Sequence, residues 1–214
     1  MALVLGTNCG FVTTAPTSNP SGTADMGVSN RVVALKVTSG GDALSITSIG
    51  WWSDVSNAES NYEVGIYDHD SNNDRPKDLL YSVTTNAKGT GAGWKTSTGL
   101  SGWNLDASTI YWIAVQVDKA TPETKMDTSA DTGEQFDWGG ATTLTNPWEE
   151  TSTVSNRIIA VYAVWEEATT GTNTQINIGD AWKEISAAKI NIGDTWKEVA
   201  GMQVNIGDAW KTVF

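Results

Sequence analysis

The sequence predicts an all-β protein, a jelly-roll-like antiparallel β-sandwich followed by a small domain of repeated β-hairpins. Between residues 30 and 167 apolar and polar residues alternate with period two, and Gly, Asn, Asp and Ser clusters interrupt the alternation roughly every ten residues. No amphipathic helical spacing is sustained in this region. The 214 residues include 21 Gly and 11 Trp, and Thr, Ser and Asn are abundant, which favours strands over helices.

Five segments show the strand pattern most clearly: residues 31–37, 44–49, 62–67, 109–117 and 157–165. Short strands joined by polar turns predict a single sandwich domain. In residues 109–117 both faces are largely apolar, so we expect a central strand or one whose outer face meets another chain. Pro76 fixes φ and predicts a loop before the next strand.

Four regions follow from these patterns. Residues 1–29, with Pro16 and Pro20 among Thr, Ser and Asn, predict an extended N-terminal arm that wraps onto the sandwich or onto a neighbour. Residues 30–167 form the predicted sandwich. Residues 168–175 are polar and aperiodic and predict a linker. Residues 176–214 contain three repeats with a period of 14.

Each repeat predicts one hairpin. INIGDAWKE begins at Ile176, returns as INIGDTWKE from Ile190 and returns again as VNIGDAWKT from Val204. A two-residue Gly-X connection is a favoured hairpin turn, and Gly-Asp stands at the centre of every copy. A two-residue loop places Asn177 opposite Trp182, whereas a three-residue loop or a bulge moves the tryptophan to the isoleucine face. The sequence leaves both registers open.

An isolated hairpin is marginal in water, so the apolar side chains of the repeats need a partner. That partner is the sandwich, another repeat, or the same segment of a neighbouring subunit. Three tryptophan-bearing hairpins per chain favour a homotrimer in which the repeats are the assembly element; a flexible docking tag would not need such regular apolar residues. The residues predicted to oligomerise are Ile176, Ile178, Trp182, Ile190, Ile192, Trp196, Val204, Ile206 and Trp210.

Charge and composition exclude several classes of partner. The formal net charge of −12 repels polyanions, so we expect neither nucleic acid nor an acidic membrane surface as a partner. No run of about 18 apolar residues is present for a spanning helix. The N-terminal residues lack the basic and apolar regions of a secretory signal, and Cys9 is the single cysteine, which suits folding in a reducing cytoplasm.

The acidic segment after residue 67 is the one candidate metal site. Oxygen-bearing side chains alternate along it, as in sites for hard cations such as Ca²⁺, and the residues concerned are Asp68, Asp70, Asn72 and Asp74. The EF-hand pattern fails because Asn73 and Leu79 stand where Gly and Glu are required. A solvated loop is the alternative. No other cofactor is expected, and the sole histidine, His69, is expected to have no chemical task.

Aromatic residues predict the other contact sites. Trp and Tyr stack on sugar rings and are enriched at interfaces, so two or more exposed together would form a glycan or subunit contact. The alternative is that these rings plug the ends of the sandwich. The candidates are Trp51, Trp52, Trp103, Trp138 and Trp148. Carboxylates are plentiful, but acidic loops are ordinary in an acidic protein, and no catalysis is expected.

The order of several short motifs resembles a widespread β-sandwich module of surface and virion proteins. The motifs are Ile49-Gly-Trp-Trp52, Val64-Gly-Ile-Tyr67, Arg75-Pro-Lys-Asp-Leu-Leu80, Gly93-Trp-Lys95 and Ser108-Thr-Ile-Tyr-Trp-Ile-Ala-Val-Gln116. The opening LGTNCGFVTTAPTSNPSGT and the closing INIGDAWK repeats resemble structural proteins of marine bacteriophages in particular. The resemblance covers nearly the whole chain, but its motifs mark strands rather than catalytic groups.

This resemblance implies a non-enzymatic virion structural protein, a surface fibre or a capsid or tail decoration protein. Such a protein would assemble in the host cytoplasm, be released by lysis and lie on the virion surface. Its implied partners are copies of itself as a homotrimer, other virion proteins and, weakly, surface glycans. Two alternatives stand beside it: a secreted carbohydrate-binding or adhesion module, and a polysaccharide-degrading tail enzyme.

Overall fold

The computed structural model divides the chain into two compact units, residues 1–168 and residues 169–214. The structure describes residues 1–21, 24–25, 31–53, 61–87, 91–118, 125–126, 128–130, 136–140, 142–148 and 157–168 of the first unit, and six strands of the second. In this part of the chain no helix has the length and apolarity that a membrane span requires.

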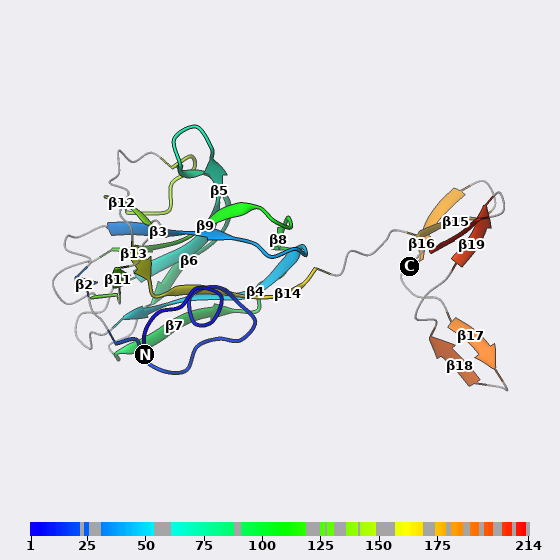
Figure 1. The fold of residues 1–214 in the computed structure, drawn as a ribbon, viewed down its shortest axis with the longest axis horizontal. Helices are drawn as coiled ribbons and strands as arrows, with labels where there is room; N and C mark the ends of the chain where they lie inside the picture. The colour runs from blue at the N-terminus through cyan, green and yellow to red at the C-terminus, as the bar shows by residue number, and fades with distance from the viewer. Residues whose placement is uncertain are drawn as a thin grey trace. The chain divides into compact units, whose positions relative to one another are not determined.

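The first unit contains two five-stranded sheets (Figure 1). Sheet I has the order β1-β14-β4-β7, with β8 also paired to β4. Its pairs are antiparallel except that β1 runs parallel to β14. The strands of sheet I are β1 (Gly10–Val12), β4 (Leu44–Ser53), β7 (Gly93–Thr98), β8 (Asn104–Leu105) and β14 (Val161–Glu167).

Sheet II is antiparallel throughout and has the order β12-β3-β9-β5-β6. Its strands are β3 (Arg31–Thr38), β5 (Asn61–Asp70), β6 (Arg75–Ala87), β9 (Ile110–Val117) and β12 (Phe136–Gly140). Two further pairs join β2 (Ala24–Asp25) to β10 (Lys125–Met126) and β11 (Thr128–Ala130) to β13 (Arg157–Ile159).

The chain passes repeatedly between the sheets, because β3, β5, β6 and β9 belong to sheet II while β4, β7 and β8 belong to sheet I. The core between them is apolar and includes residues from both sheets. Trp51 of β4, fully buried, meets Tyr62 of β5 edge to face with ring centres 5.8 Å apart. The predicted all-β sandwich is confirmed.

A seven-residue segment, residues 142–148, covers the outer face of sheet II; we call it the sheet II strap. Leu144 and Trp148 of the strap pack in a second apolar cluster with Trp112 and Ala114 of β9 and Tyr67 of β5. The prediction that residues 109–117 form a central strand is confirmed, because β9 lies between β3 and β5. Its outer face is covered by the chain's own strap.

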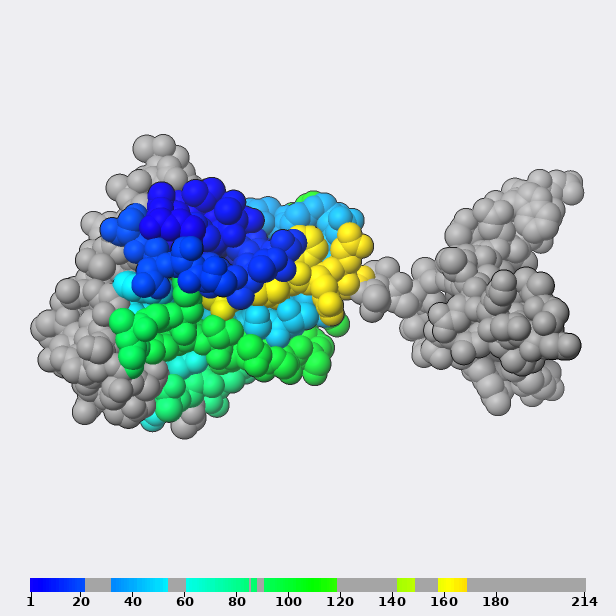
Figure 2. Space-filling view, turned by 90° about the horizontal axis from the view of Figure 1, so that it is seen from below, coloured from blue at the N-terminus to red at the C-terminus, as the bar shows by residue number. Residues whose placement is uncertain are grey.

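Residues 1–21, which we call the sheet I strap, run along the β14 edge of sheet I, as Figure 2 shows for the blue segment beside residues of β14 in yellow. Asn19 Oδ1 accepts a hydrogen bond from Trp52 Nε1 at 3.3 Å, and Ser18 O accepts one from Trp94 Nε1 at 3.2 Å. The N-terminal ammonium donates to Asn19 O at 3.0 Å. Of the two predicted courses, the N-terminal arm follows the first and packs onto its own sandwich. Residues 10–12 of the arm form β1 of sheet I.

The strands differ from the sequence prediction at several points. Residues 157–165 are divided by a bend at Ala160 into β13 and β14, which join different sheets. Pro76 lies inside β6 rather than in a loop, where its missing N–H is tolerated because β6 is an edge strand. Strand β5 continues to Asp70, so Asp68 and His69 are strand residues.

The second unit contains three two-stranded hairpins, each formed by one repeat. In the three hairpins Asn177 pairs with Trp182, Asn191 with Trp196, and Asn205 with Trp210. This is the register of a two-residue loop. The strands are β15 (Thr174–Ile178), β16 (Ala181–Ile185), β17 (Lys189–Ile192), β18 (Thr195–Glu198), β19 (Gln203–Ile206) and β20 (Ala209–Thr212).

Candidate functional site

The acidic segment predicted to bind calcium forms the turn between β5 and β6. Asp70 closes this turn: its carboxylate accepts hydrogen bonds from the backbone N–H of Asn72 at 2.9 Å and from the side-chain amide of Asn73 at 2.6 Å. These bonds, the Asn73 side chain first, lower the pKa of the exposed Asp70 carboxyl. Asp74 then takes a left-handed backbone conformation, with φ of 53°, that leads into β6.

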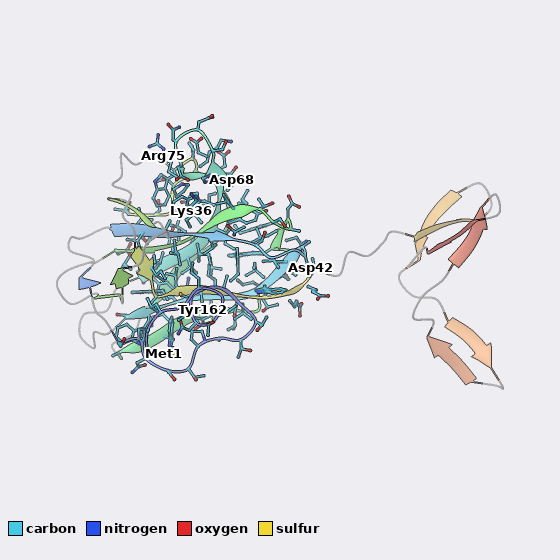
Figure 3. The ribbon with its side chains drawn as sticks, in the orientation of Figure 1. Met1, Lys36, Asp42, Asp68, Arg75 and Tyr162 are labelled. Carbon is cyan, nitrogen blue, oxygen red and sulfur yellow. The ribbon has the colours of Figure 1, made fainter. Side chains whose placement is uncertain are left out.

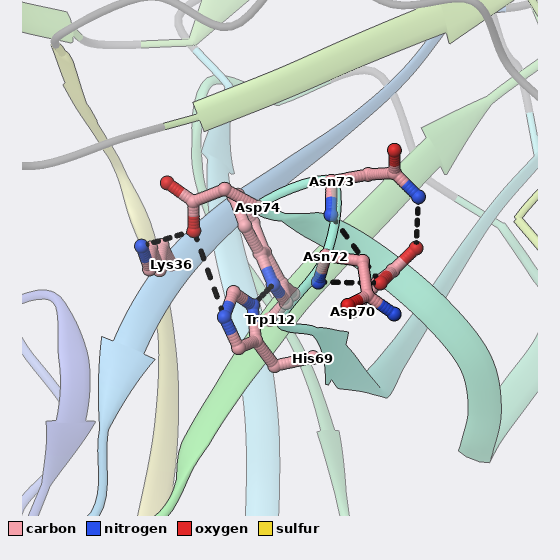
Figure 4. Close-up of polar contacts among 7 residues, drawn as sticks. All are labelled: Lys36, His69, Asp70, Asn72, Asn73, Asp74 and Trp112. Carbon is pink, nitrogen blue, oxygen red and sulfur yellow. Dashed lines mark hydrogen bonds and ion pairs between the residues drawn. The ribbon is translucent and has the colours of Figure 1, made fainter.

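A polar chain connects the turn to the outer face of sheet II (Figure 4). The Asp74 carboxylate forms an ion pair with Lys36 Nζ of β3 at 2.5 Å and lies 3.6 Å from His69 Nε2. His69 Nδ1 accepts a hydrogen bond from Trp112 Nε1 at 3.2 Å, which places the ring proton of a neutral His69 on Nε2, facing Asp74. His69 therefore satisfies the indole N–H of a fully buried tryptophan, a structural task that sequence reasoning missed.

Asp68 is engaged separately from the other members of the predicted calcium set. Its Oδ1 accepts the backbone N–H of Asp78 at 2.6 Å, while its Oδ2 lies 3.9 Å from Lys77 Nζ. Figure 3 shows Asp68, Arg75 and Lys36 on the sheet II side of the sandwich, away from Met1 and Tyr162. Within the described residues, no three His, Cys, Asp or Glu side chains are grouped closely enough to hold a metal. The calcium site stays a prediction, which titration of the full chain and of Asp70→Ala with Ca²⁺ tests.

Three of the five candidate tryptophans are buried in the described part of the chain. Trp51 is 0% exposed, Trp52 is 5% exposed and Trp148 is 8% exposed. Trp52 is bonded to the sheet I strap, and Trp148 packs edge to face on Tyr67 with ring centres 5.1 Å apart. The side chains of these three residues are therefore packed within the sandwich rather than exposed on its surface. Trp138 lies in β12, and its side chain is outside the described residues.

Trp103 is the fifth candidate and is only partly buried. Its ring stacks on Tyr81 of β6 with centres 5.2 Å apart and an interplanar angle of 14°. The Tyr81 hydroxyl donates to the carbonyl of Asn104 at 3.0 Å and accepts from its N–H at 3.2 Å. The stack thus joins the edge strand of sheet II to β8 of sheet I.

Trp165 of β14 belongs to the same end of the sandwich and was not singled out in the sequence. It pairs with Ile46 of β4 on one side, and the N–H of Ile46 donates to Trp103 O at 2.9 Å on the other. Both tryptophans pack partly buried against the core. The signal that could have found Trp165 is its place at the end of an apolar strand, immediately before Glu166 and Glu167.

The predicted oligomerisation residues all lie in the hairpin strands, at equivalent positions of the three repeats. Ile176, Ile190 and Val204 pair with Lys183, Lys197 and Lys211, and Ile178, Ile192 and Ile206 stand at the last position before each loop. Their side chains, like those of Trp182, Trp196 and Trp210, are outside the described residues.

No protein-family model, curated protein or solved structure matches this chain. The residues and their arrangement are therefore the basis for any functional assignment.

Proposed function

We propose that the protein is a non-enzymatic structural protein of a bacteriophage particle, a surface fibre or a capsid or tail decoration protein, that self-associates through its C-terminal repeats as a homotrimer. The observation that carries the proposal is the common register of the three hairpins, in which each Asn-Trp pair occupies the same position.

The repeats need partners for their backbone edges and their apolar residues. Each hairpin is a separate two-stranded sheet among the described strands, and a hairpin of four or five residues per strand is marginal in water by itself. Repeat units of this kind are stabilised by stacking on one another or on other copies. Equivalent strands from three chains would supply that stacking.

The sandwich has less need of such a partner. The outer face of sheet II is covered by the sheet II strap, and Tyr162 on the outer side of sheet I is 1% exposed. The edge strand β6 contains Pro76 and three register shifts against β5, features that discourage edge-to-edge pairing. Self-association is therefore assigned to the second unit.

The phage assignment is supported by the resemblance of the opening segment and of the INIGDAWK repeats to marine bacteriophage structural proteins. Folding without a disulfide in the host cytoplasm is compatible with the single buried Cys9. Other virion proteins are the proposed attachment partners, on the virion surface.

The test is the absolute mass of the full chain in solution, measured by light scattering at matched concentrations. We expect the wild-type chain to have three times the monomer mass of 22.8 kDa. The variant with Trp182, Trp196 and Trp210 all changed to Ala is expected to be a folded monomer. The matched control changes Lys183, Lys197 and Lys211 to Ala in the same hairpins and is expected to stay a trimer.

A monomeric wild-type chain would overturn the trimer and would favour the secreted adhesion module, with the repeats as a docking surface. A trimer that survives the three Trp→Ala changes would move the assembly contact to another part of the chain. The tail-enzyme alternative is tested by release of reducing sugar from polysaccharide, and we expect none.

A further inference from the structure

The end of the sandwich where β8 meets β4 presents three aromatic rings that the assembly role does not use. Trp103 and Trp165 lie on opposite sides of Ile46, so their backbones are about 10 Å apart, two strand spacings. Tyr81 stacks on Trp103 from the edge of sheet II. We call Tyr81, Trp103 and Trp165 the aromatic end.

The segment that carries Trp103 is held in place before any ligand arrives. Leu100 N donates to Thr47 O at 3.2 Å, and Trp103 O accepts from Ile46 N at 2.9 Å. Gly99 and Gly102 have φ of 72° and 74°, a left-handed conformation that favours glycine at both bends. A ring fixed in this way loses little conformational entropy on binding.

The indole N–H groups separate the aromatic end from the other described tryptophans. Trp52, Trp94 and Trp112 donate to Asn19, Ser18 and His69, and the N–H groups of Trp51 and Trp148 are buried. Trp103 and Trp165 donate to no described residue, and their N–H groups are not among the buried ones. Both residues are partly exposed, and neither indole N–H has a partner among the described residues.

We propose that the aromatic end is a carbohydrate-binding site for a neutral, extended chain of β-linked glucopyranose units. The C–H face of such a sugar packs on an indole, and its hydroxyl groups accept from the two indole N–H groups. An extended chain keeps successive sugar rings in line, which suits two tryptophans whose backbones lie about two strand spacings apart. This site is independent of whether the repeats trimerise.

The surrounding charges select against acidic glycans. Asp106 lies one residue beyond β8, and Glu166 follows Trp165 in β14; both side chains are exposed. Carboxylates accept hydrogen bonds from sugar hydroxyls but repel the carboxylates of a uronic-acid polymer. The exposed side chain of Asn104, whose backbone groups bond to the Tyr81 hydroxyl, is a further polar group beside Trp103.

The experiment follows the indole N–H resonances of the isotopically labelled full chain during titration with cellohexaose. Trp103→Phe and Trp165→Phe assign the two signals. We expect both signals to shift saturably with a dissociation constant of about 1 mM, while the signals of buried Trp51 and Trp112 stay fixed. Hexagalacturonic acid, added at the same concentrations, is expected to shift neither signal.

Variants then separate binding from folding. Trp103→Ala is expected to weaken cellohexaose binding by about tenfold or more, read at the Trp165 signal. Trp94→Ala is the control, because the Trp94 N–H donates to Ser18 of the sheet I strap, and it is expected to leave the affinity unchanged. The dispersion of the other indole signals confirms that each variant is folded.

Three results would overturn the proposal: no saturable shift up to about 10 mM cellohexaose, equal binding of hexagalacturonic acid, or a fall in solution mass of the otherwise folded Trp103→Ala variant. The last result would identify the aromatic end as a subunit contact. A monomeric wild-type chain that binds cellohexaose would reject the trimer and keep the carbohydrate site.

Discussion

The carboxylate of Glu63 in β5 accepts a hydrogen bond from the backbone N–H of Leu144, 81 residues later, at 2.7 Å. Glu63 is 8% exposed, so a charged acceptor is placed under the sheet II strap. Tyr67 on the same strand donates its hydroxyl to Thr145 O at 2.8 Å. Two side chains of one strand therefore hold the strap over an apolar sheet face.

We predict that Glu63→Ala destabilises the protein by about 2 to 3 kcal/mol, because it leaves the Leu144 N–H buried without its charged acceptor. Glu63→Gln keeps an acceptor oxygen and is expected to lose less. Urea unfolding followed by tryptophan fluorescence measures the difference. Asp42→Ala removes an exposed carboxylate and is the control; equal losses at positions 42 and 63 would contradict the role of the strap bond.

Gly50 of β4 makes the close packing of sheet I possible. A Cβ at this position would lie 2.7 Å from Lys95 O and 2.8 Å from two ring atoms of Tyr162. The Tyr162 ring lies against the Gly50 backbone, with its hydroxyl 2.6 Å from Thr96 Oγ1. We predict that Gly50→Ala lowers stability by about 1 to 3 kcal/mol, since backbone and a buried ring must both move.

The control for that change is Gly40→Ala, where a Cβ would meet nothing within 4 Å. Its expected effect is within about 0.5 kcal/mol of zero. Thermal unfolding of both variants decides the matter, and a Gly50→Ala protein as stable as the control would show that sheet I tolerates the extra methyl group.

The strands of the sandwich were predictable because successive residues of a strand face opposite sides of the sheet. Burial of one side therefore produces an alternation of apolar and polar residues. In β9 the inward positions Tyr111, Ile113 and Val115 alternate with Trp112 and Ala114, and this pattern identified a strand that is apolar on both faces. The three hairpins were also predictable, since Gly-Asp between two short runs is a favoured two-residue connection. The register of the repeat hairpins was not predictable, because the same sequence is compatible with a two-residue and with a three-residue loop.

The course of the sheet II strap could not be predicted, because this segment has no periodicity. Residues 142–148 read as an ordinary loop, and their place over sheet II depends on Glu63 and Tyr67, far away in the chain. The candidate tryptophans suffered from the same limitation. Trp52 resembles an exposed strand end, but β4 continues to Ser53 and the strap covers the ring. Trp103 differs from Trp52 because it is only partly buried and stacks on Tyr81. The spacing of residues in the sequence does not reveal this contact.

Tyrosine burial predicts a loss of stability in alkali. Burial first, and then the Glu63 carboxylate, raises the pKa of Tyr67, and burial also raises the pKa values of Tyr62, Tyr111 and Tyr162. In the unfolded chain these phenols lose their protons near pH 10, whereas the folded chain retains them. The unfolded state is therefore favoured as pH rises above about 10, and the stability present below that pH is progressively lost.

Tyr67→Phe tests this linkage. It removes the bond to Thr145 and is expected to lower stability at pH 8 by about 1 kcal/mol. Because it also removes one ionisable phenol, its stability should fall less steeply between about pH 10 and pH 11 than that of the wild type. Urea unfolding at about pH 10 and pH 11 gives the slope of stability against pH for the wild type and for the variant. Equal slopes would mean that Tyr67 ionises equally in the folded and unfolded states.

Asn8 organises the start of the sheet I strap, and its removal should loosen that strap selectively. Its side chain accepts from Val4 N at 2.8 Å and donates to Ala2 O at 2.9 Å, and the residue is 4% exposed. Asn8→Ala leaves two backbone groups without these partners, and we expect a loss of about 1 to 2 kcal/mol. Hydrogen exchange should accelerate in residues 1–12 while β9 keeps its protection, because the strap can open while the core stays closed.

The control, Thr14→Ala, changes an exposed strap residue and should exchange as the wild type does. Uniform acceleration across strap and core in Asn8→Ala would show that the strap and the sandwich open as one cooperative unit.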